Sequence, residues 1–239
     1  MTIFNEFSRL AQVAIRNPLN SFINDQKLSD EWQSLRFHSK PDLAKSINEF
    51  IEFKKLLDNT EIEIIELPSS DNLTIDSIYT RDSILISPKG LILCNMGRAS
   101  RTPEAKNNSE YLQSLGHEVA GEILAPGTLE GGDFIWLNNS QCAVGLGPRT
   151  NQEGISQLAE ILGKDIELHV VPLPAPSHPD DVLHLMSIIS PLDENLAVIY
   201  RPFMPASFIE WLERLGIKFV EVHEEEYLLM GCNVLAISP

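Results

Sequence analysis

The chain has 239 residues, 43% of them hydrophobic and 22% charged, so it is long enough to bury a sizeable core. Its formal net charge of −16 argues against a nucleic-acid partner, because phosphate binding requires a basic surface. The acidity either attracts a small cationic substrate over long range or serves only to keep the protein in solution.

The sequence shows no sign of membrane insertion or export. No apolar run approaches the length of a membrane span, and residues 1–20 lack the apolar core of a signal peptide. The three cysteines, Cys94, Cys142 and Cys232, are far apart and form no CxxC pair. This spacing indicates reduced thiols and gives neither a disulfide framework nor a zinc site. We therefore expect a cytoplasmic protein with no membrane partner.

The predicted elements form a repeat in which an amphipathic helix leads into a short strand. Apolar residues recur every three or four positions in the helices and near every second position in several strands. The helices are predicted at Ile47–Leu57, Tyr111–Leu115, Ile155–Leu162 and Phe208–Leu215. The strands that follow them are predicted at Glu61–Pro68, His117–Leu124, Ile166–Pro172 and Ile217–Val222.

Hairpins are predicted between these helix–strand units, at Ser83–Cys94, Phe134–Val144 and Ser187–Tyr200. Each has a turn rich in proline, glycine, asparagine or serine, as hairpin turns require. The repeating unit is therefore strand–turn–strand–helix–strand, with a spacing of roughly fifty residues. Units of this kind usually pack radially or stack, because none can bury its apolar face alone.

The tripeptide Ile-Ser-Pro occurs three times, the last time at Ile237–Pro239, where the sequence ends. The first two copies sit at hairpin turns, so the third is expected at a hairpin tip, in a strand that Cys232 opens. A strand left there would expose an unpaired edge. We therefore expect residues 1–239 to form a single domain that is truncated at its C-terminus relative to the natural protein.

The segment Glu130-Gly131-Gly132-Asp133 places two carboxylates around a glycine pair, just before an apolar run. Glycine allows a close approach of the backbone to a ligand, and carboxylates form paired hydrogen bonds with a guanidinium. The alternative is a turn with solvated acids. In a radial repeat, equivalent strand ends point to one central face. The residues expected to converge there are Asp76, Asp82, Glu130, Asp133, His184, Arg101 and Arg149.

Five segments, taken in order, resemble the guanidino-group-modifying enzymes: DSIYTRD, GRASRTPE, TLEGGDFIWL, GLGPRTNQEG and VLHLMS. The dimethylarginine dimethylaminohydrolases and amidinotransferase-like proteins are the most similar branches, and the resemblance extends from about Asn17 onward. It implies the pentein fold, an α/β-propeller of five ββαβ modules around a pseudo-fivefold axis. One module would be shared between the strand at Gln12–Arg16 and the C-terminus, and would be incomplete in this chain.

The resemblance also implies a mechanism. A cysteine thiolate attacks the guanidinium carbon to form a covalent thiouronium intermediate, and water then releases a ureido product. His184 resembles the general acid/base, and Glu130 resembles the carboxylate that works with it and binds the guanidinium. The other substrate contacts implied are Asp82 and Asp76 on the guanidinium, Arg101 and Arg149 on the α-carboxylate, and Asn72 in the loop before Asp76. Asp133 either joins them or only stabilises the turn.

The chain departs from the family pattern at two places. The family's nucleophilic cysteine lies beyond the region that matches Met230–Pro239, and Cys232 corresponds to a non-catalytic position, so we expect the 239-residue chain alone to be inactive. Met186 stands where arginine and agmatine deiminases usually carry an acid, which favours the dimethylarginine-hydrolase branch.

The expected function is therefore hydrolysis of linear amidines, with arginine or an N-methylated arginine as substrate and citrulline as product. The alternatives are an amidinotransferase and a non-catalytic pentein, either a pseudoenzyme or a ribosome-binding type. No phosphate loop, zinc spacing or dinucleotide fingerprint is present, so no cofactor or metal is expected. A homodimer is left open.

Overall fold

The computed structural model of the protein describes residues 4–175 and 183–238. Pro239, where the sequence is expected to be truncated, lies outside the described residues. The described residues form four small β-sheets, three of them three-stranded and one two-stranded, together with helices. The expected α/β class is confirmed.

Three successive segments repeat one arrangement, in which a hairpin and a helix are followed by a strand that pairs in parallel with the hairpin's second strand. The first consists of β3 (Ile84–Ser87), β4 (Gly90–Leu93), α4 (Pro103–Ser114) and β5 (Val119–Glu122). The second consists of β6 (Phe134–Asn138), β7 (Gln141–Leu146), α5 (Gln152–Leu162) and β8 (Glu167–Pro172). The third consists of β9 (Ile189–Asp193), β10 (Leu196–Ile199), α6 (Ala206–Arg214) and β11 (Lys218–Glu221).

The N-terminal part contributes the two-stranded sheet. β1 (Gln12–Ile15) pairs in parallel with β2 (Glu63–Glu66). Between these strands lie α1 (Pro18–Ser21), α2 (Asp25–Glu31) and α3 (Leu43–Asp58). All three helices begin at a side-chain cap, as at α3, where Asp42 accepts a hydrogen bond from the Lys45 N–H at 2.9 Å.

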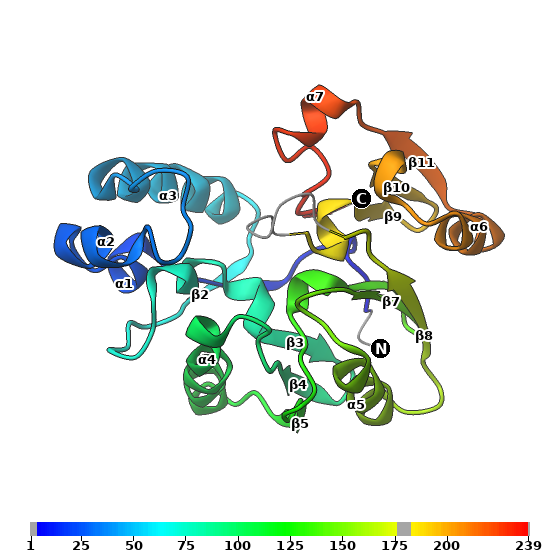
Figure 1. Ribbon diagram of the computed structural model, residues 1–239, viewed down its shortest axis with the longest axis horizontal. Coiled ribbons are helices and arrows are strands. Elements are labelled where there is room, and N and C mark those ends of the chain that lie inside the picture. The colour runs from blue at the N-terminus through cyan, green and yellow to red at the C-terminus, as the bar shows by residue number, and fades with distance from the viewer. Residues whose placement is uncertain (1–3, 176–182, 239) are drawn as a thin grey trace.

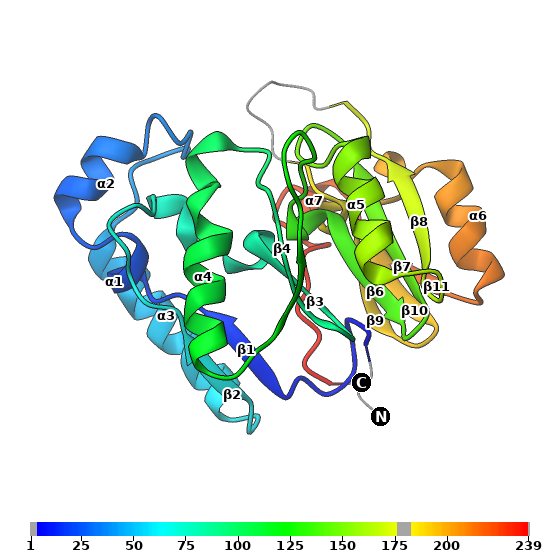
Figure 2. The ribbon, with the colours of Figure 1, turned by 90° about the horizontal axis from the view of Figure 1, so that it is seen from below.

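The helices α3, α4, α5 and α6 lie around the periphery, and the strands lie on their inner side (Figure 1). Seen from below, α5 and α6 flank the sheets of the last two units (Figure 2). Neighbouring units share their cores: Leu85 and Ile92 of the first unit pack with Phe134 and Val144 of the second. The β6–β7 hairpin packs in turn with the β9–β10 hairpin. Each apolar face is therefore buried against the next unit, as the repeat predicts.

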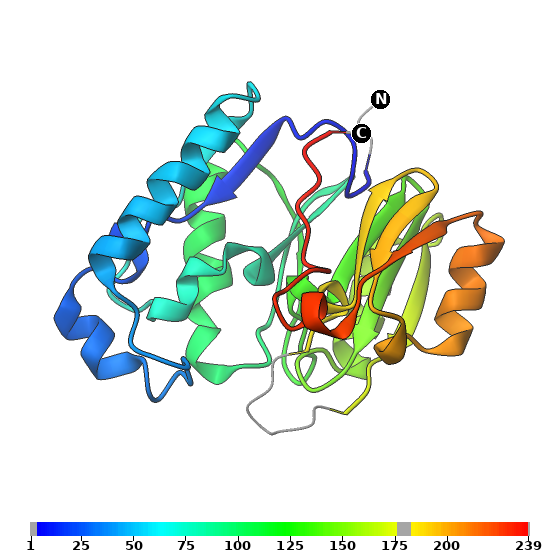
Figure 3. The ribbon, with the colours of Figure 1, turned by 90° about the horizontal axis from the view of Figure 1, so that it is seen from above.

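The C-terminal segment differs from its prediction. After α7 (Glu224–Tyr227), no strand is present among the described residues up to 238, so the expectation that Cys232 opens a strand is wrong. The Cys232 carbonyl accepts a hydrogen bond from the Ser190 hydroxyl at 2.6 Å, and the Ile237 carbonyl accepts one from the Leu10 N–H at 2.9 Å. Figure 3 shows this segment running between the β9–β10 hairpin and the N-terminal strand β1. The hydrogen bonds of residues 228–238 go to the Ser190 hydroxyl, to Leu10 and to neighbouring residues in turns, and none belongs to a strand ladder.

The three predicted hairpins and the four predicted helix–strand pairs are confirmed. Most ends differ by a few residues, but α4 begins at Pro103, eight residues before the predicted start at Tyr111. The sequence reading left α1 and α2 unassigned, since four and seven residues are too few to show a clear helical period. Within residues 4–175 and 183–238, no helix is long and apolar enough to cross a membrane.

Two adjacent leucines of α3 test the packing of the N-terminal unit. Leu57 is buried beside Ile15 and Ile62, whereas Leu56 is 65% exposed. We expect Leu57→Ala to lower the free energy of unfolding by about 2–5 kcal/mol, because it leaves a cavity. Leu56→Ala should change it by about 0.5 kcal/mol or less. Urea unfolding curves of both variants give the comparison, and equal losses would contradict the packing described.

Candidate active site

Three of the predicted site residues directly precede the hairpins. Asp82 lies in a 3₁₀ turn before β3, Glu130 lies before a 3₁₀ turn that leads into β6, and His184 lies before a 3₁₀ turn that leads towards β9. Because the three units repeat, these positions are equivalent. One polar side-chain atom of each residue lies within 4.8 Å of those of the other two. We call Asp82, Glu130 and His184 the acid–histidine cluster.

The glycine pair between Glu130 and Asp133 makes this close approach possible. A Cβ at Gly131 would lie 2.2 Å from the carbonyl oxygen of Arg81. A Cβ at Gly132 would lie 2.8 Å from the Asp82 carboxylate and 2.9 Å from the His184 ring. The Gly132 N–H donates to that same carboxylate at 3.0 Å. Any side chain at these two positions would therefore force the cluster apart.

Glu130 is fully buried and lies at the centre of the cluster. Its Oε2 lies 2.8 Å from the His184 Nε2. Its Oε1 accepts a hydrogen bond from the Arg149 Nη1 at 3.1 Å and another from the Arg98 backbone N–H at 3.2 Å. A carboxylate with these partners is held in its ionised form.

The charge states of the pair follow from these contacts. Burial acts to raise the pKa of Glu130, but the His184 hydrogen bond and the charges of His184, Arg149 and Arg101 outweigh it and lower the pKa to about 2. Burial acts to lower the pKa of His184, but the Glu130 hydrogen bond and the nearby carboxylates raise it above 6.5. The pair is therefore an ionised carboxylate beside a histidine whose protonated form the contact favours.

Asp82 is held by a buried ion-pair chain. Its Oδ2 accepts a hydrogen bond from the Arg101 Nη1 at 2.7 Å. The Nε and Nη2 of Arg101 donate to the two carboxylate oxygens of Glu104, each at 2.8 Å, and Nη2 also donates to the Tyr79 carbonyl. All three guanidinium nitrogens of Arg101 therefore donate to protein groups, and the residue is only 4% exposed to water.

Asp133 also has both of its oxygens bound to protein. Oδ2 accepts a hydrogen bond from the Thr150 hydroxyl at 2.7 Å, and Oδ1 accepts one from the Leu185 N–H at 3.0 Å. Burial raises the pKa of Asp133 to about 6 despite these bonds and the charge of His184. This geometry matches the interpretation of Asp133 as an acid that supports the turn.

The two remaining predicted residues, Asp76 and Asn72, differ in burial and in their hydrogen-bond partners. Asp76 is buried and accepts a hydrogen bond from the Arg98 Nη1 at 2.9 Å, while burial raises its pKa. Arg98 connects Asp76 to the cluster, because its backbone N–H donates to Glu130. Asn72 is exposed, and its described hydrogen bond comes from the Ser70 hydroxyl.

Sequence reasoning missed three residues that build the site. Arg98, which the sequence analysis did not single out, contacts both Asp76 and Glu130. Thr150 is fully buried, accepts from the Glu130 N–H at 3.1 Å and donates to Asp133. Glu104 is 1% exposed and binds Arg101. The motifs that contain them, GRASRTPE and GPRTN, were the available signal.

None of the three cysteines has a thiol that ionises readily. Cys94, Cys142 and Cys232 are all buried and free of disulfides. Burial raises the pKa of the Cys94 thiol well above its usual value, that of Cys142 to about 12 and that of Cys232 to about 11. Each therefore stays protonated at neutral pH, and a protonated thiol is a poor nucleophile.

The acid–histidine cluster also has the residue types of a metal site. Its carboxylates, however, already face Arg101, Arg149 and the His184 imidazolium. A metal ion would have to displace these cations from the carboxylates.

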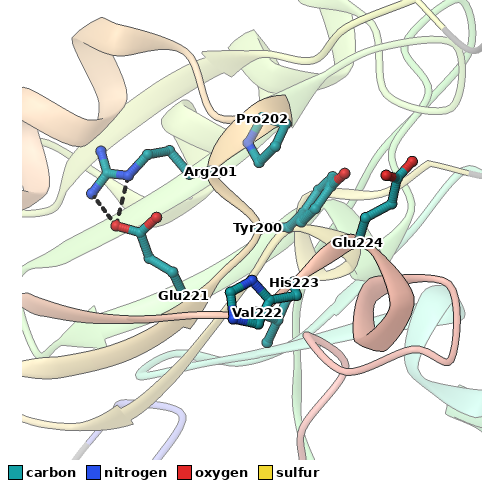
Figure 4. Close-up of a pocket in the computed structure, with 7 residues that line it drawn as sticks. All are labelled: Tyr200, Arg201, Pro202, Glu221, Val222, His223 and Glu224. Atoms are coloured by element: carbon teal, nitrogen blue, oxygen red, sulfur yellow. Dashed lines mark hydrogen bonds and ion pairs between the residues drawn. The ribbon is translucent and has the colours of Figure 1, made fainter.

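An open hollow of about 430 Å³ lies apart from the cluster, at the ends of β10 and β11. Its lining comprises Tyr200, Arg201, Pro202, Glu221, Val222, His223 and Glu224, with an Arg201–Glu221 ion pair on one wall (Figure 4). None of the predicted site residues lines this hollow.

Two comparisons of the sequence with known proteins both find dimethylarginine hydrolases. The sequence profile described as N,N dimethylarginine dimethylhydrolase, eukaryotic, matches residues 20–239. A dimethylarginine dimethylaminohydrolase of Pseudomonas aeruginosa is 28% identical over 194 residues, which cover 81% of this chain and 71% of that protein.

Two solved structures of enzymes that act on arginine or its derivatives are similar to this chain. A cysteine-to-serine mutant of the Pseudomonas aeruginosa dimethylarginine dimethylaminohydrolase, complexed with citrulline, matches at 25% identity with a TM-score of 0.66, covering 92% of this chain and 94% of that one. The N-terminal domain of ArgZ, a cyanobacterial arginine dihydrolase, matches at 15% identity with a TM-score of 0.78, covering 95% of this chain and 81% of that one. At that identity the second likeness concerns the fold alone.

The Glu130–His184 pair gives the folded protein a defined pH dependence. The pKa of Glu130 is lowered from 4.5 to about 2, so its contribution to stability is complete above pH 4.5 and is lost as the pH falls towards 2. The pKa of His184 is raised from 6.5, so its contribution is complete below pH 6.5 and is lost as the pH rises through the higher value. The pair therefore stabilises the fold most between pH 4.5 and 6.5.

Two histidines should titrate on opposite sides of pH 6.5. His184 should titrate above it, and His169 below it, because burial lowers the pKa of His169. We expect Glu130→Gln to lower the pKa of His184 and to leave that of His169 unchanged, since the variant removes the charge that His184 faces. An NMR titration of the histidine ring protons measures both. A His184 pKa that stays the same in Glu130→Gln would contradict the pairing.

Proposed function

Because the chain belongs to the N,N-dimethylarginine dimethylhydrolase family, we propose that it carries the guanidinium-binding part of a hydrolase of linear amidines. The reaction is cleavage of the guanidinium C–N bond of arginine or an N-methylated arginine, giving citrulline plus ammonia or an amine. The observation that carries this proposal is the buried contact of 2.8 Å between Glu130 and His184, with Asp82 beside it. Citrulline in the structure of the Pseudomonas aeruginosa relative supports the choice of product.

Glu130 and Asp82 bind the substrate guanidinium in this proposal. The Arg149 Nη1 already lies 3.1 and 3.3 Å from the two oxygens of Glu130, so that carboxylate is oriented to accept a guanidinium. Two ionised carboxylates in a buried site attract a planar cation strongly. Met186, a thioether, adds no third acid, which is consistent with a substrate whose guanidinium carries methyl groups.

His184 moves the protons. As an imidazolium it donates a proton to the leaving amine when the guanidinium C–N bond breaks, and the neutral ring then takes a proton from the water that attacks the covalent intermediate. Glu130 keeps the ring oriented and stabilises its charged form. The nucleophile in this proposal is a cysteine thiolate, and none of Cys94, Cys142 and Cys232 is assigned to it, because burial keeps their thiols protonated.

The arginines divide into two roles. Arg101 holds Asp82 in place, since its nitrogens are bound by Asp82, Glu104 and the Tyr79 carbonyl. Arg149 and Arg98, whose side chains are 19% and 22% exposed, bind the substrate α-carboxylate. This changes the sequence-based assignment, in which Arg101 was paired with Arg149. Asp76, which is bound to Arg98, stays a proposed ligand of the guanidinium, and the exposed Asn72 a weaker proposed contact.

The complete fold is proposed to be the five-module pentein propeller. Three ββαβ units and a β1–β2 sheet support this proposal, since the packing of Ile237 against the β1–β2 core brings the last described residues to the N-terminal strand. An amidinotransferase remains the second candidate function, because it differs only in using an amine in place of water to resolve the intermediate.

The first test is turnover by the full-length gene product. We expect citrulline from arginine or an N-methylated arginine, and a loss of roughly 100-fold or more in kcat for Glu130→Gln and His184→Gln. Glu122→Gln and His169→Gln are the matched controls and should retain wild-type rates. If arginine and every methylated arginine stay intact with the wild-type protein, the proposed function is wrong.

A second test separates the roles of the arginines by comparing arginine with agmatine, which lacks the carboxylate. Arg98→Lys and Arg149→Lys should raise KM for arginine by roughly 10-fold, by loss of charge-assisted hydrogen bonds, and should leave KM for agmatine nearly unchanged. Arg101→Lys should lower kcat for both substrates alike, because it loosens Asp82. A selective loss of arginine binding in Arg101→Lys would contradict this division.

A further inference from the structure

Thr150 joins the two halves of the proposed catalytic pair through its hydroxyl. The side chain of Thr150 is fully buried, and the residue follows Arg149 in the segment after β7. Its oxygen accepts a hydrogen bond from the Glu130 backbone N–H at 3.1 Å and donates one to the Asp133 Oδ2 at 2.7 Å. A single hydroxyl therefore fixes the backbone of Glu130 against a second buried carboxylate.

Asp133 extends this connection to the histidine. Its second oxygen, Oδ1, accepts a hydrogen bond from the N–H of Leu185, the residue that follows His184. The turn from His184 to Ser187 is itself closed, because the Ser187 N–H donates to the His184 carbonyl at 2.9 Å. A Cβ at Gly145 would lie 3.0 Å from Oδ1, so close packing also restricts the carboxylate.

The chain of hydrogen bonds runs from the Glu130 backbone through Thr150 and Asp133 to the backbone beside His184. The side chains of Glu130 and His184 meet at 2.8 Å at its two ends. Both oxygens of Asp133 are bound to protein groups, so none is directed at a substrate. General acid–base catalysis depends on the geometry of such a pair, and a displacement of about 1 Å can cost about 100-fold in rate.

We propose that Thr150 and Asp133 are positioning residues, which act on the reaction by holding Glu130 and His184 in register. This inference rests on the proposed function for its kinetic consequence, but its structural part concerns the contacts alone. It assigns the second acid of the Glu130–Asp133 segment to the support of the catalytic pair and not to the substrate.

The structural part is tested in the 239-residue chain with three variants. Thr150→Val removes the hydroxyl at nearly constant volume, and Thr150→Ser restores it. Asp133→Asn keeps the shape but leaves one oxygen, which can serve either Thr150 or Leu185 and not both. Thr102→Val is the matched control, because Thr102 is exposed and its hydroxyl donates to the Ala99 carbonyl and not to a residue of the cluster.

NMR on the folded variants gives two local readouts, the exchange rate of the Leu185 amide proton and the pKa of His184, and a loss of stability alone would not change the second. Thr150→Val should raise the exchange rate of the Leu185 amide proton by about 10-fold or more and bring the pKa of His184 down towards 6.5. Thr150→Ser and Thr102→Val should match the wild type in both. If Thr150→Val does not fold, the Leu185 exchange rate in Asp133→Asn decides the same question.

Kinetics of the full-length gene product test the consequence. We expect Thr150→Val and Asp133→Asn to lower kcat by about 10- to 100-fold with KM within about twofold, and Thr150→Ser to recover most of the rate. If the wild type forms no citrulline, the proposed function fails while the NMR result still decides the positioning. If the wild type is active and Thr150→Val leaves kcat and the Leu185 exchange rate unchanged, the positioning role is refuted.

Discussion

The burial of several carboxylates close together is the constraint that organises this molecule. Glu130, Asp82 and Glu104 are all nearly or fully excluded from water. Buried charges of like sign are tolerated only when cations and N–H donors compensate them. The cations come from segments that follow the strands β4 and β7, and from the histidine that precedes β9. The repeat places all these strand ends together, so the fold and the compensation of charge depend on each other.

The same arrangement explains how one protein can be both rigid and receptive to a cation. Arg101 is bound on all sides by Asp82, Glu104 and a carbonyl, and therefore belongs to the framework. Arg149 and Arg98 are partly exposed and share the carboxylates of Glu130 and Asp76. A substrate that brings its own guanidinium and its own carboxylate can exchange partners with them without leaving a buried charge unpaired.

Much of the fold was readable from the sequence because hairpins and amphipathic helices are local patterns. Turn residues near Pro88, Asn138 and Asn195 predicted the three hairpins that the structure contains. The second Ile-Ser-Pro, expected at a turn, lies instead within β9, where Pro191 pairs with Ala197. Residues 228–238 were not predictable in this way, since whether Val234 joins a sheet depends on a neighbouring strand and not on its own sequence. The positions of Glu130 and His184 followed from the repeat and the resemblance. The roles of Thr150, Arg98 and Glu104 did not, because they depend on contacts between residues distant in the chain.

The central claim is that a guanidinium binds at the acid–histidine cluster. A crystal structure of the full-length gene product with a non-hydrolysable arginine analogue tests it most directly. We expect the guanidinium to lie between the carboxylates of Asp82 and Glu130, with the α-carboxylate on Arg149 and Arg98. An analogue bound in the hollow beside Tyr200, with the Arg149–Glu130 and His184–Glu130 contacts undisturbed, would contradict it.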